Sequence, residues 1–251
     1  MILLVDIGNT RIKWALSDGA RFQAQAAAQH KGVPVVEVFT AAWATLAAPD
    51  RVLVANVAGK IMAAALRAWV KASWGLNVEF LVPRRKACGV SNAYVEAQRL
   101  GADRWAALIG AHARVTGNVC VIDCGSAVTI DALDAKGQHL GGLIIPGRAM
   151  MQNALIQNTD GISEQAVSRG DNKASVLARD TQSAVTGGAL YTLIAVIDRV
   201  SADLAAELQA PLTRVICGGD AESLLNLLAE NYRYEPDLVL HGLAIVAETA
   251  K

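Results

Sequence analysis

The fold is decided by the stretch Leu4-Val5-Asp6-Ile7-Gly8-Asn9-Thr10-Arg11-Ile12-Lys13, because the chain uses its pattern twice. The second copy is Val121-Ile122-Asp123-Cys124-Gly125-Ser126-Ala127-Val128-Thr129. In each copy an apolar strand ends in an Asp, a Gly-centred turn follows, and a second strand leads away. Each turn can direct backbone N–H groups and a carboxylate at one ligand. Two such hairpins facing each other indicate a nucleotide clamp.

The turns suit a polyphosphate. Gly8 and Gly125 lack a Cβ atom, so backbone N–H donors can approach phosphate oxygens closely. Asn9, Thr10 and Ser126 add small amide or hydroxyl groups at the same places. The alternative is that both turns are ordinary hairpin turns, in which Gly-Asn and Gly-Ser pairs are common. The repetition favours the nucleotide interpretation.

The charged residues of the hairpins match a metal-bound phosphate. Mg²⁺ is usually held by one or two carboxylates and by phosphate oxygens, a role that Asp6 and Asp123 are able to share. Lys13 follows the first turn on the strand face that Arg11 also occupies, opposite Ile12. Lys13 therefore can reach a phosphate.

Composition restricts the class of partner. The chain has 251 residues, of which 53% are hydrophobic, and a formal net charge of zero. Neutral charge argues against nucleic acid or an anionic membrane as partner and favours a small molecule. Apolar residues in excess suggest a dimer, while no apolar run approaches the roughly 18 residues that span a bilayer. Asp6 interrupts the apolar start, which argues against a signal peptide and predicts a cytoplasmic protein.

Cysteine and histidine give no metal signature. Cys88, Cys120, Cys124 and Cys217 form no Cys-x-x-Cys pair, and three of them lie in apolar runs, so we interpret them as packing residues. The four histidines show no zinc-binding spacing. Zinc and haem are not expected.

Hydrophobic periodicity repeats the same order of elements in both halves. The expected strands span 2–6, 11–17, 21–28, 51–57, 77–82, 119–123, 127–133, 138–145 and 214–217, and the expected helices 34–47, 59–73, 104–115, 181–209, 220–230 and 238–250. This order is typical of an α/β protein with duplicated ribonuclease-H-like lobes, the architecture of actin, heat-shock chaperone ATPases and sugar kinases. We expect an N-terminal lobe at 1–117 and a C-terminal lobe at 118–251.

A second informative stretch is Leu100-Gly101-Ala102-Asp103-Arg104-Trp105. With a helix beginning at Arg104, Asp103 would be its N-cap, and a structural role for this pair is the simpler interpretation. The functional alternative is that the carboxylate accepts a proton from an alcohol while Arg104 and free helix N–H groups hold an anionic substrate. Two interpretations also stay open for Gly218-Gly219-Asp220, which is either an adenosine contact or a plain turn.

Together these motifs, with Gly141-Gly142-Leu143-Ile144-Ile145-Pro146-Gly147, closely resemble the type III pantothenate kinases, a family that includes Bvg accessory factors. The resemblance runs from residue 1 to about 245. It implies ATP-dependent phosphorylation of pantothenate to 4′-phosphopantothenate, the first step of coenzyme A synthesis. It also implies a homodimer whose pantothenate pocket is completed by the neighbouring subunit.

The resemblance assigns roles to residues of this chain. The ATP-binding residues would be Asp6, Ile7, Gly8, Asn9, Thr10, Arg11, Ile12, Lys13 and Ser126. The pantothenate-binding residues would be Tyr94, Gly101, Ala102, Asp103, Arg104 and Thr181, with Asp103 as proton acceptor. Asp123 would bind a monovalent cation, K⁺ or NH₄⁺, and Asp6 is a candidate for Mg²⁺. For Thr181 the alternative is an N-cap hydroxyl.

Two positions depart from the family pattern. Ser126 stands where Thr is usual, which keeps the hydroxyl, and Ala97 stands where many relatives have Pro, which predicts a less rigid loop around Tyr94. Two other functions stay open at this point. One is a kinase of the same superfamily for a sugar or polyol, which would not need Arg104, and the other is a regulatory accessory role.

Overall fold

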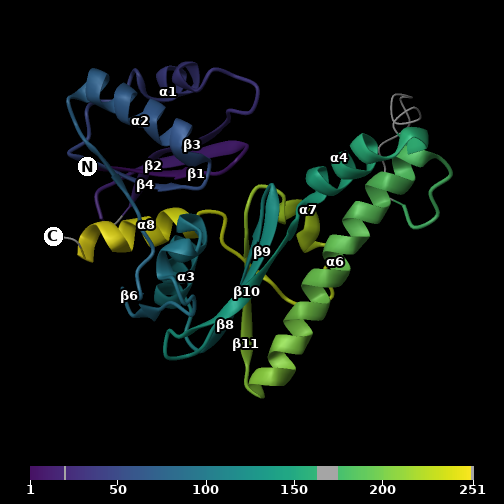
Figure 1. Ribbon diagram of the computed structural model, residues 1–251. Coiled ribbons are helices and arrows are strands. Elements are labelled where there is room, and N and C mark those ends of the chain that lie inside the picture. The colour runs from purple at the N-terminus through teal and green to yellow at the C-terminus, as the bar shows by residue number, and fades with distance from the viewer. Residues whose placement is uncertain (20, 163–174, 250–251) are drawn as a thin grey trace. The chain divides into compact units, whose positions relative to one another are not determined.

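A computed structural model describes residues 1–19, 21–162 and 175–249 of the chain (Figure 1). The strands are β1 Ile2–Ile7, β2 Arg11–Ser17, β3 Phe22–Gln29, β4 Arg51–Asn56, β5 Val78–Phe80, β6 Lys86–Ala87, β7 Val90–Ser91, β8 Asn118–Cys124, β9 Ala127–Leu133, β10 His139–Pro146, β11 Leu212–Cys217 and β12 Arg233–Tyr234. The helices are α1 Val35–Trp43, α2 Gly59–Trp74, the 3₁₀ turn η1 Ala97–Arg99, α3 Ala102–Arg114, α4 Arg148–Asn158, α6 Thr181–Leu208, α7 Ala221–Leu225 and α8 Leu238–Thr249.

The two larger sheets have the same strand order. The first is β3-β2-β1-β4-β5 and the second is β10-β9-β8-β11-β12. In each sheet the first three strands follow one another in the sequence. In the first sheet β1 pairs antiparallel with β2, β2 pairs antiparallel with β3, and β1 runs parallel to β4. Corresponding elements occupy corresponding places in both sheets. The expected duplication of a ribonuclease-H-like arrangement is therefore confirmed.

Contacts group the described chain into two compact units. Unit 1 comprises Met1–Val119, Asp131–Gly141 and Asp237–Lys251, and unit 2 comprises Cys120–Ile130 and Gly142–Pro236. The division falls within β8, β9 and β10, so these strands contribute residues to both units. The lobe boundary expected at residue 117 remains a prediction, since grouping by contacts does not follow the duplicated architecture.

In unit 1 helices cover both faces of the first sheet. The aromatic rings of Phe39, Trp43 and Trp69, from α1 and α2, pack with Trp14 of β2 in one apolar cluster. On the other face lie α3 and α8 (Figure 1). This double cover explains why β1 is almost continuously apolar, because each face of its backbone is buried.

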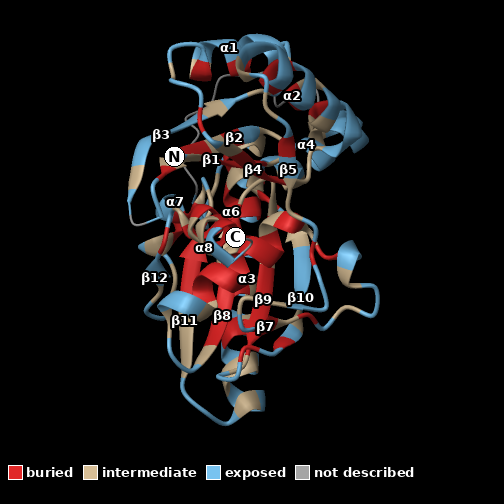
Figure 2. Ribbon diagram, turned by 90° about the vertical axis from the view of Figure 1, so that its left-hand side faces the viewer, coloured by how far each residue is buried: buried red, intermediate tan, exposed pale blue. Residues whose placement is uncertain are grey.

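Helices α3 and α8 approach each other closely because glycines face the contact. A Cβ atom on Gly242 would overlap the carbonyl oxygen of Ala106, and one on Gly110 would lie against the carbonyl oxygen of Leu238. Small residues at a crossing allow two helix backbones to touch. Most of α3 from Ala102 to Ala111 is buried, as the red ribbon in Figure 2 shows. The start of α3 is consequently held on a rigid element.

In unit 2 the inner core lies between the second sheet and helices α6 and α7. Ile122 and Val128 of the sheet share an apolar cluster with Leu193 and Ile197 of α6 and Leu224 of α7. Cys120, Cys124 and Cys217 are buried in this unit, as the packing interpretation expects. No helix in the described part of the chain is long and apolar enough to cross a membrane.

Several expected boundaries were wrong. Helix α3 begins at Ala102 instead of Arg104, and its N-cap is Gly101, so Asp103 is not the N-cap. Helix α7 ends at Leu225, well short of residue 230. Helix α4 was not expected because none of its residues is buried, which removes the periodic apolar signal on which the prediction of helices depends.

Candidate active site

The first hairpin joins β1 to β2 and places two opposite charges across from each other. Asp6 pairs directly with Lys13 in the antiparallel register, and the turn is closed by the Gly8 N–H, which donates to the Arg11 carbonyl oxygen at 3.0 Å. Adjacent antiparallel residues bring side chains of one face close together. Asp6 and Lys13, which are predicted to act on the metal-bound phosphate, therefore lie at directly paired positions of β1 and β2.

His30 fixes this turn and was not found by sequence reasoning. Its Nε2 donates to the Gly8 carbonyl oxygen at 2.8 Å, and its backbone N–H donates to the Thr10 carbonyl oxygen at 3.0 Å. Both acceptors lie in the predicted phosphate-binding run. A single histidine after a strand belongs to no recognisable sequence motif, so this role is seen only in the folded chain.

The second hairpin, between β8 and β9, is enclosed by two glycines of unit 2. Gly125 donates its N–H to the Ala127 carbonyl oxygen at 3.0 Å, which closes the turn. A Cβ atom on Gly147 would overlap the carbonyl oxygens of Gly125 and Ser126. Gly218, at φ +96°, leaves no room for a Cβ beside Asp123 Oδ1. These glycines are required by close backbone approach to the hairpin.

The Cys124 thiol lies near two carboxylates, those of Asp123 and Asp220. The Asp220 N–H donates to the Cys124 carbonyl oxygen at 3.0 Å, which brings the turn after β11 against the hairpin. Burial, with the nearby charges of Asp123 and Asp220, raises the pKa of the Cys124 thiol. Cys124 therefore stays protonated and is not a nucleophile.

Asp103 is the second residue of α3, and Gly101 makes room for it. A Cβ atom on Gly101 would overlap Asp103 Oδ1, and this oxygen accepts the Arg104 N–H at 2.7 Å. Burial raises the pKa of the Asp103 carboxyl, and the hydrogen bond from the Arg104 N–H opposes that rise. A partly desolvated carboxylate with a raised pKa is typical of a general base.

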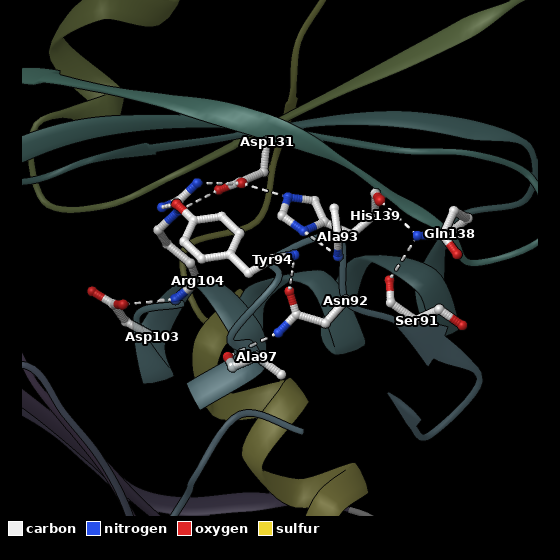
Figure 3. Close-up of polar contacts among 10 residues, drawn as sticks. All are labelled: Ser91, Asn92, Ala93, Tyr94, Ala97, Asp103, Arg104, Asp131, Gln138 and His139. Carbon is white, nitrogen blue, oxygen red and sulfur yellow. Dashed lines mark hydrogen bonds and ion pairs between the residues drawn. The ribbon is translucent and has the colours of Figure 1, made fainter. Parts of the chain in front are cut away.

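Arg104 is buried and not on a solvated surface. Its Nε and Nη2 donate to the two carboxylate oxygens of Asp131 at 2.8 and 2.6 Å, and its Nη1 donates to the Tyr94 hydroxyl at 2.9 Å (Figure 3). The structure thus brings Tyr94 and Arg104 together, although they come from a loop and from α3. Their shared partner Asp131 was not predicted. A single Asp within the apolar strand Ala127–Leu133 was the available signal, because a buried carboxylate needs a partner.

The loop that carries Tyr94 is held by hydrogen bonds. Asn92 donates from Nδ2 to the Ala97 carbonyl oxygen at 3.0 Å and accepts the Tyr94 N–H at 2.9 Å. Arg85 donates to the Tyr94 carbonyl oxygen at 3.0 Å. These bonds order the loop although Ala97 lacks the restriction of a proline.

Thr181 is the first residue of α6, in unit 2. The N-cap is Asp180, whose Oδ1 accepts the Ser183 N–H at 2.8 Å. The alternative interpretation of Thr181 as the capping residue is therefore wrong. Ser126 and Asp123 also belong to unit 2, whereas Asp6–Lys13, Tyr94 and Gly101–Arg104 belong to unit 1.

Comparison with known proteins shows which family the chain is similar to. Residues 2–203 match the family model described as type III pantothenate kinase. A type III pantothenate kinase of Nitrosococcus oceani is 45% identical over 255 residues, covering 99% of this chain and 94% of the relative.

Solved structures agree on the fold. A Campylobacter jejuni protein assigned to the Baf family of transcriptional activators has a TM-score of 0.60 at 22% identity, covering 99% of this chain and 98% of its own. A Sinorhizobium meliloti protein assigned as a 2-dehydro-3-deoxygalactonokinase has a TM-score of 0.59 at 14% identity, with 100% and 99% covered.

Proposed function

The chain belongs to the type III pantothenate kinase family, and on this basis we propose which of its residues bind ATP, which bind pantothenate and which accepts the proton. The enzyme phosphorylates pantothenate in coenzyme A biosynthesis, and ATP is the phosphate donor. A divalent metal accompanies the nucleotide in kinases. The roles of individual residues, the monovalent cation and the dimer are the proposals that follow.

ATP binds to the two hairpins. The run Asp6–Lys13 surrounds the phosphates with backbone N–H groups and with the Lys13 ammonium, and Ser126 contributes a hydroxyl from the second hairpin. Phosphoryl transfer needs positioning and charge neutralisation more than covalent chemistry. The order that His30 gives to the first turn supports this assignment, because a binding loop held before the ligand arrives loses less entropy.

The donor groups at the hairpins fit the two cations. Asp6 supplies a carboxylate for Mg²⁺, a hard ion that prefers oxygen ligands. Asp123 supplies one for the monovalent cation, K⁺ or NH₄⁺. When bound, these ions neutralise the oxygens of the transferring phosphate. Gly218 keeps the space beside Asp123 Oδ1 clear of a side chain.

Pantothenate binds at the start of α3, where Asp103 accepts the proton of its primary hydroxyl. The raised pKa supports this role, because a less solvated carboxylate is a stronger base. Arg104 and Tyr94 bind the rest of the molecule. Although Asp131 balances the charge of Arg104, each terminal nitrogen of the guanidinium retains an N–H that the hydrogen bonds above do not use. These donors are assigned to the pantothenate carboxylate.

The active enzyme is a homodimer in which Thr181 contributes to the pantothenate site of the neighbouring subunit. Large apolar side chains are exposed on three elements of unit 2, namely Leu143 and Ile144 of β10, Met150 and Leu155 of α4 and Tyr191 of α6. Exposed large apolar side chains are typical of a subunit interface. Sedimentation at twice the 26.4 kDa of the chain supports the dimer, and a stable monomer contradicts it.

The observation that carries the assignment is the placement of Asp103 beside Arg104, with Tyr94 on the guanidinium. Its test incubates the protein with ATP, Mg²⁺, K⁺ and pantothenate and measures ADP and phosphopantothenate, with sugars and polyols as competing acceptors. With ATP present, we expect product from pantothenate but not from the sugars or polyols. Product formation should be lost in Asp103→Asn but not in the surface control Glu37→Gln. Equal turnover of a sugar, or near-wild-type turnover in Asp103→Asn, would refute the assignment. The cytoplasmic location remains a prediction.

A further inference from the structure

Asp131 is a buried carboxylate for which the assignments above leave no role in the reaction. Its side chain is 3% exposed, and its two oxygens accept three hydrogen bonds, from Arg104 Nε and Nη2 and from His139 Nε2 at 2.9 Å. Asp131 lies on β9 and His139 on β10, within the part of these strands that belongs to unit 1. Figure 3 shows the carboxylate between the guanidinium and the imidazole.

His139 connects this carboxylate to the loop that carries Tyr94. An ionised carboxylate only accepts hydrogen bonds, so Nε2 carries the proton and Nδ1 is left as an acceptor. Nδ1 accordingly faces the Ala93 N–H at 3.5 Å. The imidazole also lies almost parallel to the Tyr94 ring, with 6.2 Å between ring centroids and 18° between planes. The ring of Tyr94 is therefore restrained by His139 and its hydroxyl by Arg104.

Stability alone is a weak reason for this arrangement. Buried ion pairs lose most of their Coulombic gain to desolvation, and well-packed apolar side chains often stabilise a core equally well. A bidentate pair does give a fixed orientation to the guanidinium plane. That orientation determines where the remaining N–H groups of Arg104 point.

We propose that Asp131 and His139 are positioning residues for pantothenate, holding Arg104 and Tyr94 in the orientation that binds the substrate. This inference rests on the proposed function. Asp131 acts through Arg104, and His139 acts through Asp131 and through the Tyr94 ring. Neither residue takes part in proton or phosphoryl transfer.

The decisive variant is Asp131→Asn, which keeps the shape of the side chain but replaces one acceptor oxygen with a donor that opposes the guanidinium. We expect the KM for pantothenate to rise about 10- to 100-fold, the loss typical of a hydrogen bond to a charged group, while the KM for ATP changes less than twofold. The matched control is Glu79→Gln in the bidentate Arg51–Glu79 pair of the same unit, with bonds of 2.8 Å. This control should leave both KM values unchanged.

A double variant tests whether Asp131 acts through Arg104. In an Arg104→Gln background, Asp131→Asn should raise the KM for pantothenate no further, because the group that it orients is gone. Additive effects would contradict the proposed route. A KM for pantothenate within twofold of wild type in Asp131→Asn, with only a lower unfolding temperature, would overturn the proposal.

If Asp131→Asn does not fold, variants of His139 test the positioning role instead. His139→Gln retains an N–H able to reach Asp131, whereas His139→Ala does not. We expect His139→Ala to raise the KM for pantothenate about 3- to 10-fold and His139→Gln to recover most of that loss. Wild-type KM values in both variants would refute the positioning role. An inactive wild-type protein, by contrast, would refute the proposed function itself.

Discussion

Gly101 lies so close to Asp103 that a Cβ atom added to it would overlap Oδ1 of the carboxylate. The proposed base therefore occupies a position that only glycine leaves free. Because the side chain of Asp103 folds back over the residue that precedes its helix, the carboxylate is partly removed from water. The same contact offers a way to displace the base without altering its chemistry.

Gly101→Ala should lower kcat for pantothenate about 10- to 100-fold, because a methyl group pushes the carboxylate out of line with the hydroxyl. Steady-state kinetics measure the loss, and the KM for ATP serves as the internal reference. The control is Gly161→Ala, since no atom lies within 4 Å of a Cβ at Gly161. Wild-type kcat in Gly101→Ala would argue against Asp103 as the base.

The pH dependence of kcat/KM should reflect the ionisation of the Asp103 carboxyl. Burial raises the pKa of this carboxyl, so the fall in activity on the acid side should lie at a higher pH than an ordinary Asp side chain would give. Asp103→Asn should lower kcat about 10²- to 10⁴-fold and abolish that limb. An acid limb that persists in the residual activity of the variant would assign the limb to another group.

The same raised pKa predicts the effect of Asp103 on folding. The native state holds the proton more tightly than the unfolded chain, so the contribution to stability is complete below the unfolded pKa and is lost as the pH rises through the folded pKa. At neutral pH Asp103→Asn should therefore unfold at the same temperature as wild type or higher. Thermal unfolding at pH 4 and pH 7 measures this, and a clear loss of stability at pH 7 would contradict it.

His30 should affect the nucleotide and not the vitamin. His30→Ala removes the hydrogen bond to the Gly8 carbonyl oxygen, and we expect the KM for ATP to rise about 3- to 10-fold, the usual weight of a neutral hydrogen bond. The KM for pantothenate should stay within twofold. His30→Gln, which keeps a donor, should lie between the two. A selective effect on pantothenate would show that the hairpin assignment is mistaken.

Thr181 and Asp180 are neighbours with separable roles. Thr181→Val should raise the KM for pantothenate about 3- to 10-fold with little effect on unfolding, since the hydroxyl does not cap α6. Asp180→Ala should lower the unfolding temperature and leave the KM for pantothenate nearly unchanged, because Asp180 accepts the Ser183 N–H. That bond lowers the pKa of Asp180, so the stability it provides is present above the unfolded pKa and disappears as the pH falls through the folded pKa. Kinetics and thermal unfolding of both variants separate the roles.

Much of the architecture was predictable because it depends on local periodicity. The repeated Asp-then-Gly hairpin, with alternating strands and helices, predicted two sheets of equal order, and both are present. Errors arose where local signals are weak. Helix α4 buries no residue, and no capping side chain marks the start of α3. Motif spacing likewise sufficed to identify the family.

The amino-acid sequence by itself determined the fold class, the family and the residue types at the hairpins and at Gly101–Arg104, since each motif is a contiguous run of residues and the order of the motifs is read directly. The tertiary structure alone decided the surroundings of Arg104, because Tyr94, Asp131 and His139 come from separate segments that meet only after folding. It also placed His30 on the Gly8 turn. The physical reason is that a buried charge must be matched by whichever groups the fold brings within hydrogen-bonding distance, and sequence spacing does not encode that choice.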